Sequence, residues 1–284
     1  SLLYISPVDE LKFTPRLNFA TFENATTLDS RRYGLDSEWT HKFSATRTLR
    51  AGASYTKIEY DSTQNDQDYE RVYFGFDSEL RSLFYSLEAG YNLINPEQGK
   101  ETREPYYSFE LSYVNSLHTL SLSGSSIITD SSLGDGNDDP LSDTSPANGN
   151  ASQLDQLTRD QLAIAYVYSQ LCNTCSLGIE VIYEDEQHIN LRNLDLKELT
   201  FATNLNFKLS PVSSLNLRLS HKTADFQFDP TSDYDESAIS IELQHAISQQ
   251  LTTGFFSRYE KRDSETAANN YSELSGGMNI QYNF

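Results

Sequence analysis

The sequence predicts an all-β fold: a transmembrane antiparallel up-and-down β-barrel of about 14 strands, with short periplasmic turns and long extracellular loops. Three observations predict it. Apolar residues recur at every second position, the links between such segments are alternately short and long, and acidic charge gathers in the long links. No stretch approaches the roughly 18 consecutive apolar residues of a membrane-spanning helix. With a mean hydropathy of −0.55, the two classes that remain are a soluble all-β protein and a membrane barrel.

The aromatic content and the alternation favour the barrel. Eighteen Tyr and fifteen Phe stand against one Met, which suits aromatic girdles better than a packed aliphatic core. One side of each alternating segment is apolar and is predicted to face lipid, whereas the other carries charged, hydroxyl or glycine residues. The clearest segments are residues 72–76, 83–91, 107–113, 177–183, 199–207, 215–219, 239–243 and 278–284. The residues expected to point outward near mid-strand are Phe74, Leu87, Leu111, Ile179, Leu217 and Ile241.

The links set the topology. Six short and seven long links make thirteen, which predicts fourteen strands with both termini on the short-turn side. Greek-key sandwiches would scatter long and short links irregularly, whereas short turns at one end and long loops at the other are typical of outer-membrane barrels. The short links lie near residues 44–47, 80–82, 115–116, 173–174, 211–214 and 248–250. The long ones lie near residues 24–32, 60–70, 94–105, 128–160, 184–198, 224–236 and 260–270.

The chain divides into two predicted parts. Residues 1–15 are expected to form a periplasmic lead-in or a short plug, and residues 16–284 the barrel. The first ten residues have neither a basic region nor an apolar core, so any export signal is expected to have been removed. The predicted location is the bacterial outer membrane.

The carboxyl end resembles a known family. The segment Met278-Asn279-Ile280-Gln281-Tyr282-Asn283-Phe284 looks like the terminal strand of bacterial outer-membrane β-barrel proteins. That resemblance implies the barrel assembly machinery as a partner and Phe284 as the assembly signal. Hairpins such as residues 43–55 (FSATRTLRAGASY) further resemble the β-barrel porins that accompany exopolysaccharide and exosortase loci.

The net charge of −20 lies mainly in the long links. These links hold 28 Asp and Glu against 9 Lys and Arg, and the rest of the chain holds 13 acids and 12 bases. The distribution favours a porin-like channel that passes small hydrophilic, in particular cationic, solutes. The alternative is a structural or partner-binding barrel of an envelope assembly such as exopolysaccharide export. Outer-membrane lipid and lipopolysaccharide are further expected partners, with divalent cations bridging the acidic loops to the anionic lipid.

Charged residues of both signs fall on the inward positions of the strands. In one interpretation they line a water-filled pore. In the other they form ion pairs that fill a barrel too narrow to conduct, because fourteen strands lie between the ~8 that leave no pore and the ~16 that leave an open channel. The pore-lining candidates are Arg50, Arg71, Asp77, Glu88, Glu110, Glu180, Arg218, Glu242 and Arg258.

No motif for catalysis, a cofactor or a metal is complete, so we expect no enzymatic activity. Cys172 and Cys175 fall on a predicted periplasmic turn and indicate a disulfide, because no second CxxC or nearby His completes a metal site. Asp135, Asn137 and Asp139 have the spacing that opens a calcium loop, but Pro140 stands where an EF-hand needs Gly. His188 stands among loop carboxylates without a serine or second acidic pair. The acidic surface argues against nucleic acid.

Overall fold

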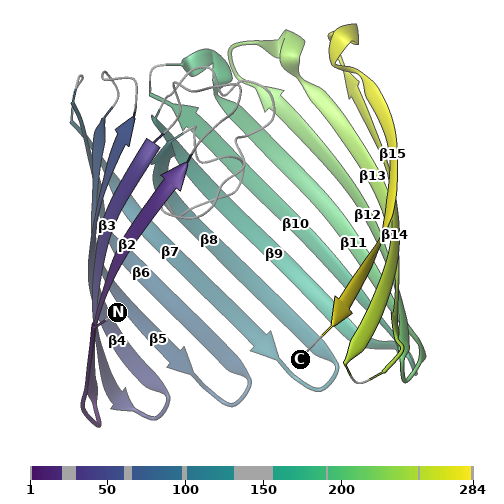
Figure 1. Cartoon of the computed structure of the whole chain (residues 1–284), viewed down its shortest axis with the longest axis horizontal. Helices are drawn as coiled ribbons and strands as arrows, with labels where there is room; N and C mark the ends of the chain where they lie inside the picture. Colours follow the sequence, from purple (N-terminus) through teal and green to yellow (C-terminus); the bar gives the residue numbers. More distant parts are fainter. Residues whose placement is uncertain are drawn as a thin grey trace. The chain divides into compact units, whose positions relative to one another are not determined.

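The computed structural model describes residues 2–20, 30–60, 66–97, 101–130, 156–189, 191–248 and 250–282. These residues form a sheet of fifteen strands in which each strand lies beside its neighbours in the sequence (Figure 1). Short 3-10 turns (η3, Arg192–Leu194; η4, Pro230–Ser232; η5, Ala267–Asn269) lie in three long links. The strands are β1 (Leu2–Ile5), β2 (Asp9–Ala20), β3 (Ser30–Ser44), β4 (Arg47–Tyr60), β5 (Gln67–Glu79), β6 (Leu83–Pro96), β7 (Thr102–Val114), β8 (His118–Asp130), β9 (Gln156–Cys172), β10 (Cys175–His188), β11 (Leu196–Ser210), β12 (Ser213–Phe226), β13 (Tyr234–Ala246), β14 (Leu251–Ser264) and β15 (Tyr271–Tyr282).

The chain forms two compact units. Unit 1 consists of Ser1–Leu111, Gly124–Asp160 and Glu186–Arg192, and it contains β1 to β6 complete. Unit 2 consists of Ser112–Ser123, Gln161–Asp185 and Asn193–Phe284, and it contains β11 to β15 complete. No helix in the described part of the chain is long and apolar enough to cross a membrane.

The fourteen predicted strands correspond to β2 through β15, and all six predicted short turns connect strands where the sequence placed them. The strand count differs by one, because Leu2–Ile5 forms the additional strand β1. It pairs with β2 from Leu2 opposite Phe13 to Ile5 opposite Glu10. Residues 2–5 and 9–15, expected as a lead-in or plug, therefore lie in the sheet.

A compact turn explains this difference. The hydroxyl of Ser6 accepts hydrogen bonds from the backbone N–H groups of Val8 (3.3 Å) and Asp9 (2.8 Å). Side-chain bonds of this kind stabilise a reversal over very few residues. A four-residue strand before such a turn is too short to show a period of two, so the alternation could not reveal it.

The strand register separates an apolar face from a polar face. Leu217 lies opposite Ile241, while the neighbouring Arg218 lies opposite Ser240. The apolar face is exposed: Phe74 is 70% accessible and Leu274 73%. Large side chains at such exposure are costly in water but suit a lipid environment. The remaining outward residues named above that are exposed are Leu87, Leu111, Ile179 and Ile241.

Candidate functional site: the charged polar face

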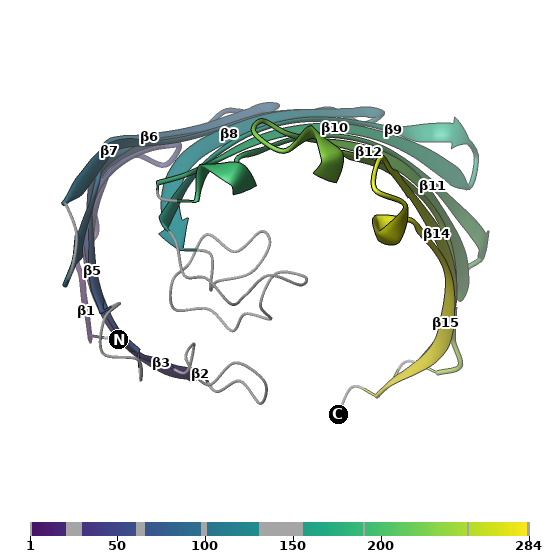
Figure 2. The ribbon, with the colours of Figure 1, turned by 90° about the horizontal axis from the view of Figure 1, so that it is seen from above.

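Strands β2, β3, β5 and β6 of unit 1 follow one curved wall in the view from above (Figure 2). Arg50 stands in β4 on the polar face of this wall. Its register partner in β5 is Gly75, whose own partner in β6 is Glu88. Because Gly75 has no side chain, the Arg50 guanidinium extends across β5 and reaches β6.

Arg50 binds carboxylates on both strands beyond it. Its Nε and Nη2 donate to Asp77 Oδ2 (2.7 Å) and Oδ1 (2.8 Å), which is a two-pronged contact. Nη1 lies 2.6 Å from Glu88 Oε1 and 3.9 Å from Glu38 Oε2. Nη2 also donates to the hydroxyl of Ser86 (3.0 Å), which in turn donates to Asp77 Oδ1 (2.6 Å). One cation thus compensates three carboxylates from three strands.

Two tyrosines complete the group. Tyr73 of β5 donates its hydroxyl to Glu38 (2.7 Å), and Tyr106 of β7 donates to Glu88 (2.6 Å). The guanidinium of Arg71 lies 4.6 Å from the centre of the Tyr106 ring, a cation–π distance. We call Glu38, Arg50, Tyr73, Asp77, Ser86, Glu88 and Tyr106 the Arg50 network.

Glycines make room for Tyr73. Its register partners are Gly52 in β4 and Gly90 in β6. A Cβ on Gly52 would lie 2.3 Å from the Tyr73 ring, so the ring occupies the space above Gly52 on its way to Glu38. A Cβ on Gly90 would lie 1.9 Å from the Val72 carbonyl oxygen and 2.8 Å from the Tyr73 Cα. The Arg50 network therefore depends on a glycine on each side of Tyr73.

Gly90→Ala is expected to lower the free energy of unfolding by about 1–3 kcal/mol, the usual range for overpacking. The two atoms closest to the new methyl group belong to the backbone and cannot rotate away. Gly178→Ala is the matched control, because its Cβ would meet no atom closer than 3.7 Å. Urea unfolding of the two variants in the same detergent compares them, and equal midpoints would contradict the close approach at Gly90.

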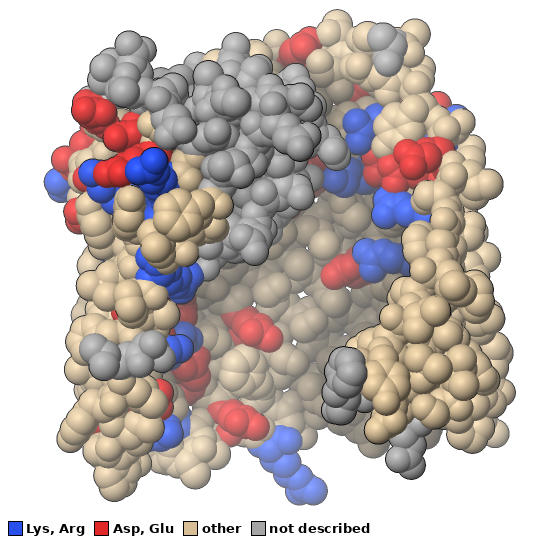
Figure 3. All heavy atoms as spheres, in the orientation of Figure 1, with Lys and Arg blue, Asp and Glu red and all other residues tan. Residues whose placement is uncertain are grey.

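Unit 2 carries a second group of ion pairs on its polar face, at the ends of the strands that the long links join. Arg262 of β14 donates to Glu236 of β13 through Nη2 (2.7 Å) and lies 3.9 Å above the Tyr234 ring and 5.1 Å from the Tyr271 ring. Lys222 of β12 pairs with Glu198 of β11 at 3.1 Å. The hydroxyls of Tyr234 and Tyr271 donate to Glu198 and Glu236. In the space-filling view, acidic and basic side chains lie beside one another (Figure 3).

Some of the predicted pore-lining residues contact one another in the structure. Arg50, Asp77 and Glu88 belong to the Arg50 network, and Arg71 adjoins it while donating to Asn92 (2.9 Å). Arg218 and Glu180 pair separately in unit 2 at 3.4 Å. Of the others, Arg258 pairs with Glu260, Glu242 accepts from Gln244 (2.9 Å), and Glu110 is exposed on β7.

The predicted pore-lining residues did not include four members of the network: Glu38, Tyr73, Ser86 and Tyr106. The available signal was the set of polar-face glycines 52, 75 and 90 on three consecutive strands. In the part of the chain that the structure describes, no group of three or more His, Cys, Asp or Glu is placed to hold a metal ion. Asp135, Asn137, Asp139 and Phe284 lie outside the described residues.

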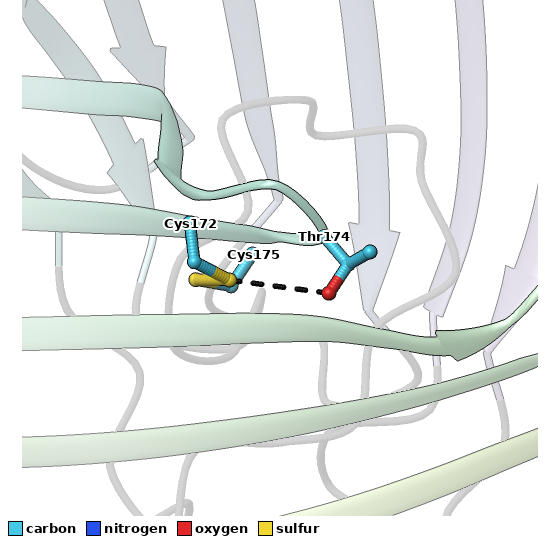
Figure 4. Close-up of a disulfide and its surroundings, with 3 residues drawn as sticks. All are labelled: Cys172, Thr174 and Cys175. Carbon is cyan, nitrogen blue, oxygen red and sulfur yellow. Dashed lines mark hydrogen bonds between the residues drawn. A yellow bond between two sulfur atoms is a disulfide. The ribbon is translucent and has the colours of Figure 1, made fainter.

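Cys172 and Cys175 form a disulfide across the turn between β9 and β10, as the sequence predicted (Figure 4). Their Cα atoms are 5.0 Å apart, and only Asn173 and Thr174 lie between them. The Thr174 hydroxyl lies 3.9 Å from the Cys172 sulfur. The disulfide covalently joins the two strands of this hairpin at its short-turn end.

Removing this disulfide in Cys172→Ser/Cys175→Ser is expected to cost about 2 kcal/mol at most, because the entropy of closing so small a loop is low. The barrel should still assemble, since the backbone pairing of the hairpin does not depend on the sulfur atoms. Thermal unfolding of the protein with and without a reductant measures the loss. Failure of the double Ser variant to fold would show that the staple is essential rather than auxiliary.

Comparison with known proteins supports the fold. No protein-family model matches the sequence, and no curated protein matches it. Among solved structures, OmpT, an outer-membrane protein of Vibrio cholerae, matches 99% of both chains with a TM-score of 0.52 at 9% identity. The anion-selective porin of Comamonas acidovorans matches 97% of this chain and 100% of its own with a TM-score of 0.50 at 9% identity.

A larger receptor also matches. The siderophore receptor PirA of Acinetobacter baumannii gives a TM-score of 0.56 at 7% identity over 96% of this chain and 52% of its own. At these identities the likeness shows the fold alone. The predicted fold class is confirmed, and the predicted outer-membrane location agrees with it. The chain has the fold of bacterial outer-membrane β-barrels.

Proposed function

We propose that the protein is an outer-membrane channel for small hydrophilic solutes. The observation that carries the proposal is the pairing of an exposed apolar face with a charged polar face along the same strands. In a membrane barrel the apolar face contacts lipid and the polar face lines the interior. Water and small polar solutes are stabilised by such a wall.

Cation preference is the finer part of the proposal. The polar face carries paired charges, so the wall adds little net field beyond its local groups. The long links instead carry 28 acidic residues against 9 basic ones, an excess of 19 negative charges. In the β12–β13 link, hydroxyl hydrogen bonds from Thr231 (2.6 Å) and Ser232 (2.7 Å) lower the pKa of the Asp229 carboxyl below its ordinary value. Such a carboxyl stays ionised at neutral pH.

We expect a preference for K⁺ over Cl⁻ that is visible in dilute KCl and fades in concentrated KCl. Charges around a mouth act over about a Debye length, ~8 Å at physiological salt and ~3 Å at 1 M. Reversal potentials across a KCl gradient in planar bilayers, at two mean concentrations, measure the preference. Preference for anions at low salt would refute the cation selectivity while leaving the channel itself intact.

The absence of any conductance in bilayers would contradict the channel. The remaining proposal would then be a structural or partner-binding barrel of an envelope assembly, whose partner could be sought by crosslinking in intact cells. Two controls make a negative result meaningful: the sample must migrate as a folded, heat-modifiable barrel on gels, and a known porin must conduct in the same membranes.

A further inference from the structure

The apolar face of β3 ends in polar side chains next to its short turn. In the middle of the strand this face is apolar and exposed, with Tyr33 at 40% and Leu35 at 49%. Trp39 and His41 continue the same row, because every second residue of a strand shares a face. The register places Asp9, the first residue of β2, opposite His41. A carboxylate therefore lies on the lipid-facing side of the sheet, where a charged side chain is costly unless it has partners.

Two residues of β3 hold this carboxylate. The indole N–H of Trp39 donates to Asp9 Oδ1 (3.2 Å), and His41 Nδ1 lies 2.8 Å from the same oxygen. The His41 ring stacks on Trp39, with centroids 5.7 Å apart, and lies perpendicular to the Phe43 ring at 4.8 Å. Asp9 is nevertheless 37% accessible. Because both contacts use Oδ1, Oδ2 keeps its capacity to accept hydrogen bonds from a group outside the chain.

A cation lies on the same face of the next strand. Leu49 of β4 is the register partner of His41, and Arg47 stands two residues before it, so Arg47 shares the face of His41. Arg47 is exposed. All of these residues belong to unit 1. Its lipid-facing side thus combines an oriented carboxylate, a guanidinium and aromatic rings beside the short turns.

The depth of these residues in the membrane determines which lipids they meet. Asp9 begins β2, Arg47 begins β4, and His41 lies three residues before the end of β3. The short turns of outer-membrane barrels lie on the periplasmic side, and aromatic residues near strand ends lie at the level of the lipid headgroups. The residues therefore lie at the headgroups of the periplasmic leaflet, which consists of phospholipids.

We propose that Asp9 and Arg47 form a binding site for the headgroup of phosphatidylethanolamine, with His41 and Trp39 as positioning residues for Asp9. The lipid ammonium donates to Asp9 Oδ2, and the lipid phosphate accepts from the Arg47 guanidinium. Charge complementarity selects this lipid. Phosphatidylglycerol has no cation for Asp9, and the nitrogen of phosphatidylcholine has no N–H to donate. The inference depends on the outer-membrane location and not on the proposed channel function.

The first test uses Trp39, the one tryptophan of the chain, which contacts Asp9 and so reports on lipid at the site. The protein is reconstituted in phosphatidylcholine vesicles that contain equal fractions of brominated phosphatidylethanolamine, phosphatidylglycerol or phosphatidylcholine. Bromine quenches indole fluorescence on contact, so the three degrees of quenching give relative association constants. We expect phosphatidylethanolamine to bind about two- to fivefold more strongly than the other two lipids, the range of one exposed charge pair.

Variants identify the groups responsible. Asp9→Asn keeps an oxygen that can accept from Trp39 but removes the charge, so the preference for phosphatidylethanolamine should disappear. Asp235→Asn is the matched control, because Asp235 is an exposed carboxylate of β13 that accepts from Thr223 (2.9 Å) near the long-link end. It should keep the preference. In mixed detergent micelles, Arg47→Ala should weaken the binding of phosphatidylethanolamine and phosphatidylglycerol alike, because both carry the phosphate.

Loss of the preference in Asp9→Asn and its retention in Asp235→Asn support the site. Equal quenching by the three lipids in the unmodified protein would overturn it. So would a preference that survives Asp9→Asn, since the contacts of Asp9 would then only join β2 to β3. Stronger quenching by phosphatidylglycerol would mean that Arg47 attracts anionic lipid and would overturn the headgroup assignment. If Asp9→Asn does not fold, the three lipids compared on the unmodified protein and on Arg47→Ala still decide.

Discussion

Replacing Arg50 with Leu is expected to lower the free energy of unfolding by about 2–3 kcal/mol, less than the about 3–5 kcal/mol of a fully buried ion pair, because the side chains of this network are partly exposed. The substitution leaves Asp77, Glu88 and Glu38 close together without their shared cation. The side chains of Asp77 and Glu88 are only 24% and 15% accessible, so water replaces the lost contacts poorly. Urea unfolding followed by the fluorescence of Trp39, the one tryptophan, measures the loss.

Two controls identify the cause. Arg50→Lys keeps the charge but loses the two-pronged contact with Asp77, so its loss should be intermediate. Arg258→Ala removes a cation whose side chain is 51% accessible and should cost less than about 1 kcal/mol. If Arg50→Leu and Arg258→Ala lowered the free energy of unfolding by the same small amount, the ion pairs of the Arg50 network would not stabilise the fold.

Placing Arg on the apolar face is the second large effect. Phe74→Arg and Ile241→Arg should each cost about 2–4 kcal/mol, the range for a cation at the bilayer midplane. Both residues stand near the middle of their strands and are exposed, at 70% and 46%. Refolding into lipid vesicles with a urea titration gives the cost.

The control for this experiment lies on the polar face. Ser112→Arg on β7 should cost little if the interior is wet. Gly75, the polar-face neighbour of Phe74, is not a suitable control, because a Cβ there would lie 3.2 Å from the Glu88 side chain and 3.5 Å from the Arg50 side chain. Equal penalties at Phe74 and Ser112 would mean that both faces are packed, and the open channel would be untenable.

Much of the candidate site could be predicted from the sequence. Arg50, Asp77 and Glu88 are inward by the alternation alone, and both cysteines flank a two-residue turn. The strand β1 escaped notice, because four residues cannot display a period. The roles of Tyr73 and Tyr106 could not be predicted for another reason. The neighbouring sequence of an aromatic residue on a charged face does not show whether its hydroxyl joins a hydrogen-bond network or stays exposed.

The sequence by itself determined the topology and the two faces of the sheet. Both follow from local properties: side chains alternate along a strand with a period of two, and link lengths are read directly from the chain. Only the tertiary structure decided which charges meet and which side chains of distant strands contact each other. Arg50 forms an ion pair with Glu88 across Gly75, and Gln67 accepts a hydrogen bond from Gln156, which lies four strands away in the sheet. Such contacts depend on the relative register of several strands and on the curvature of the wall, and neither is encoded in the spacing of residues within one strand.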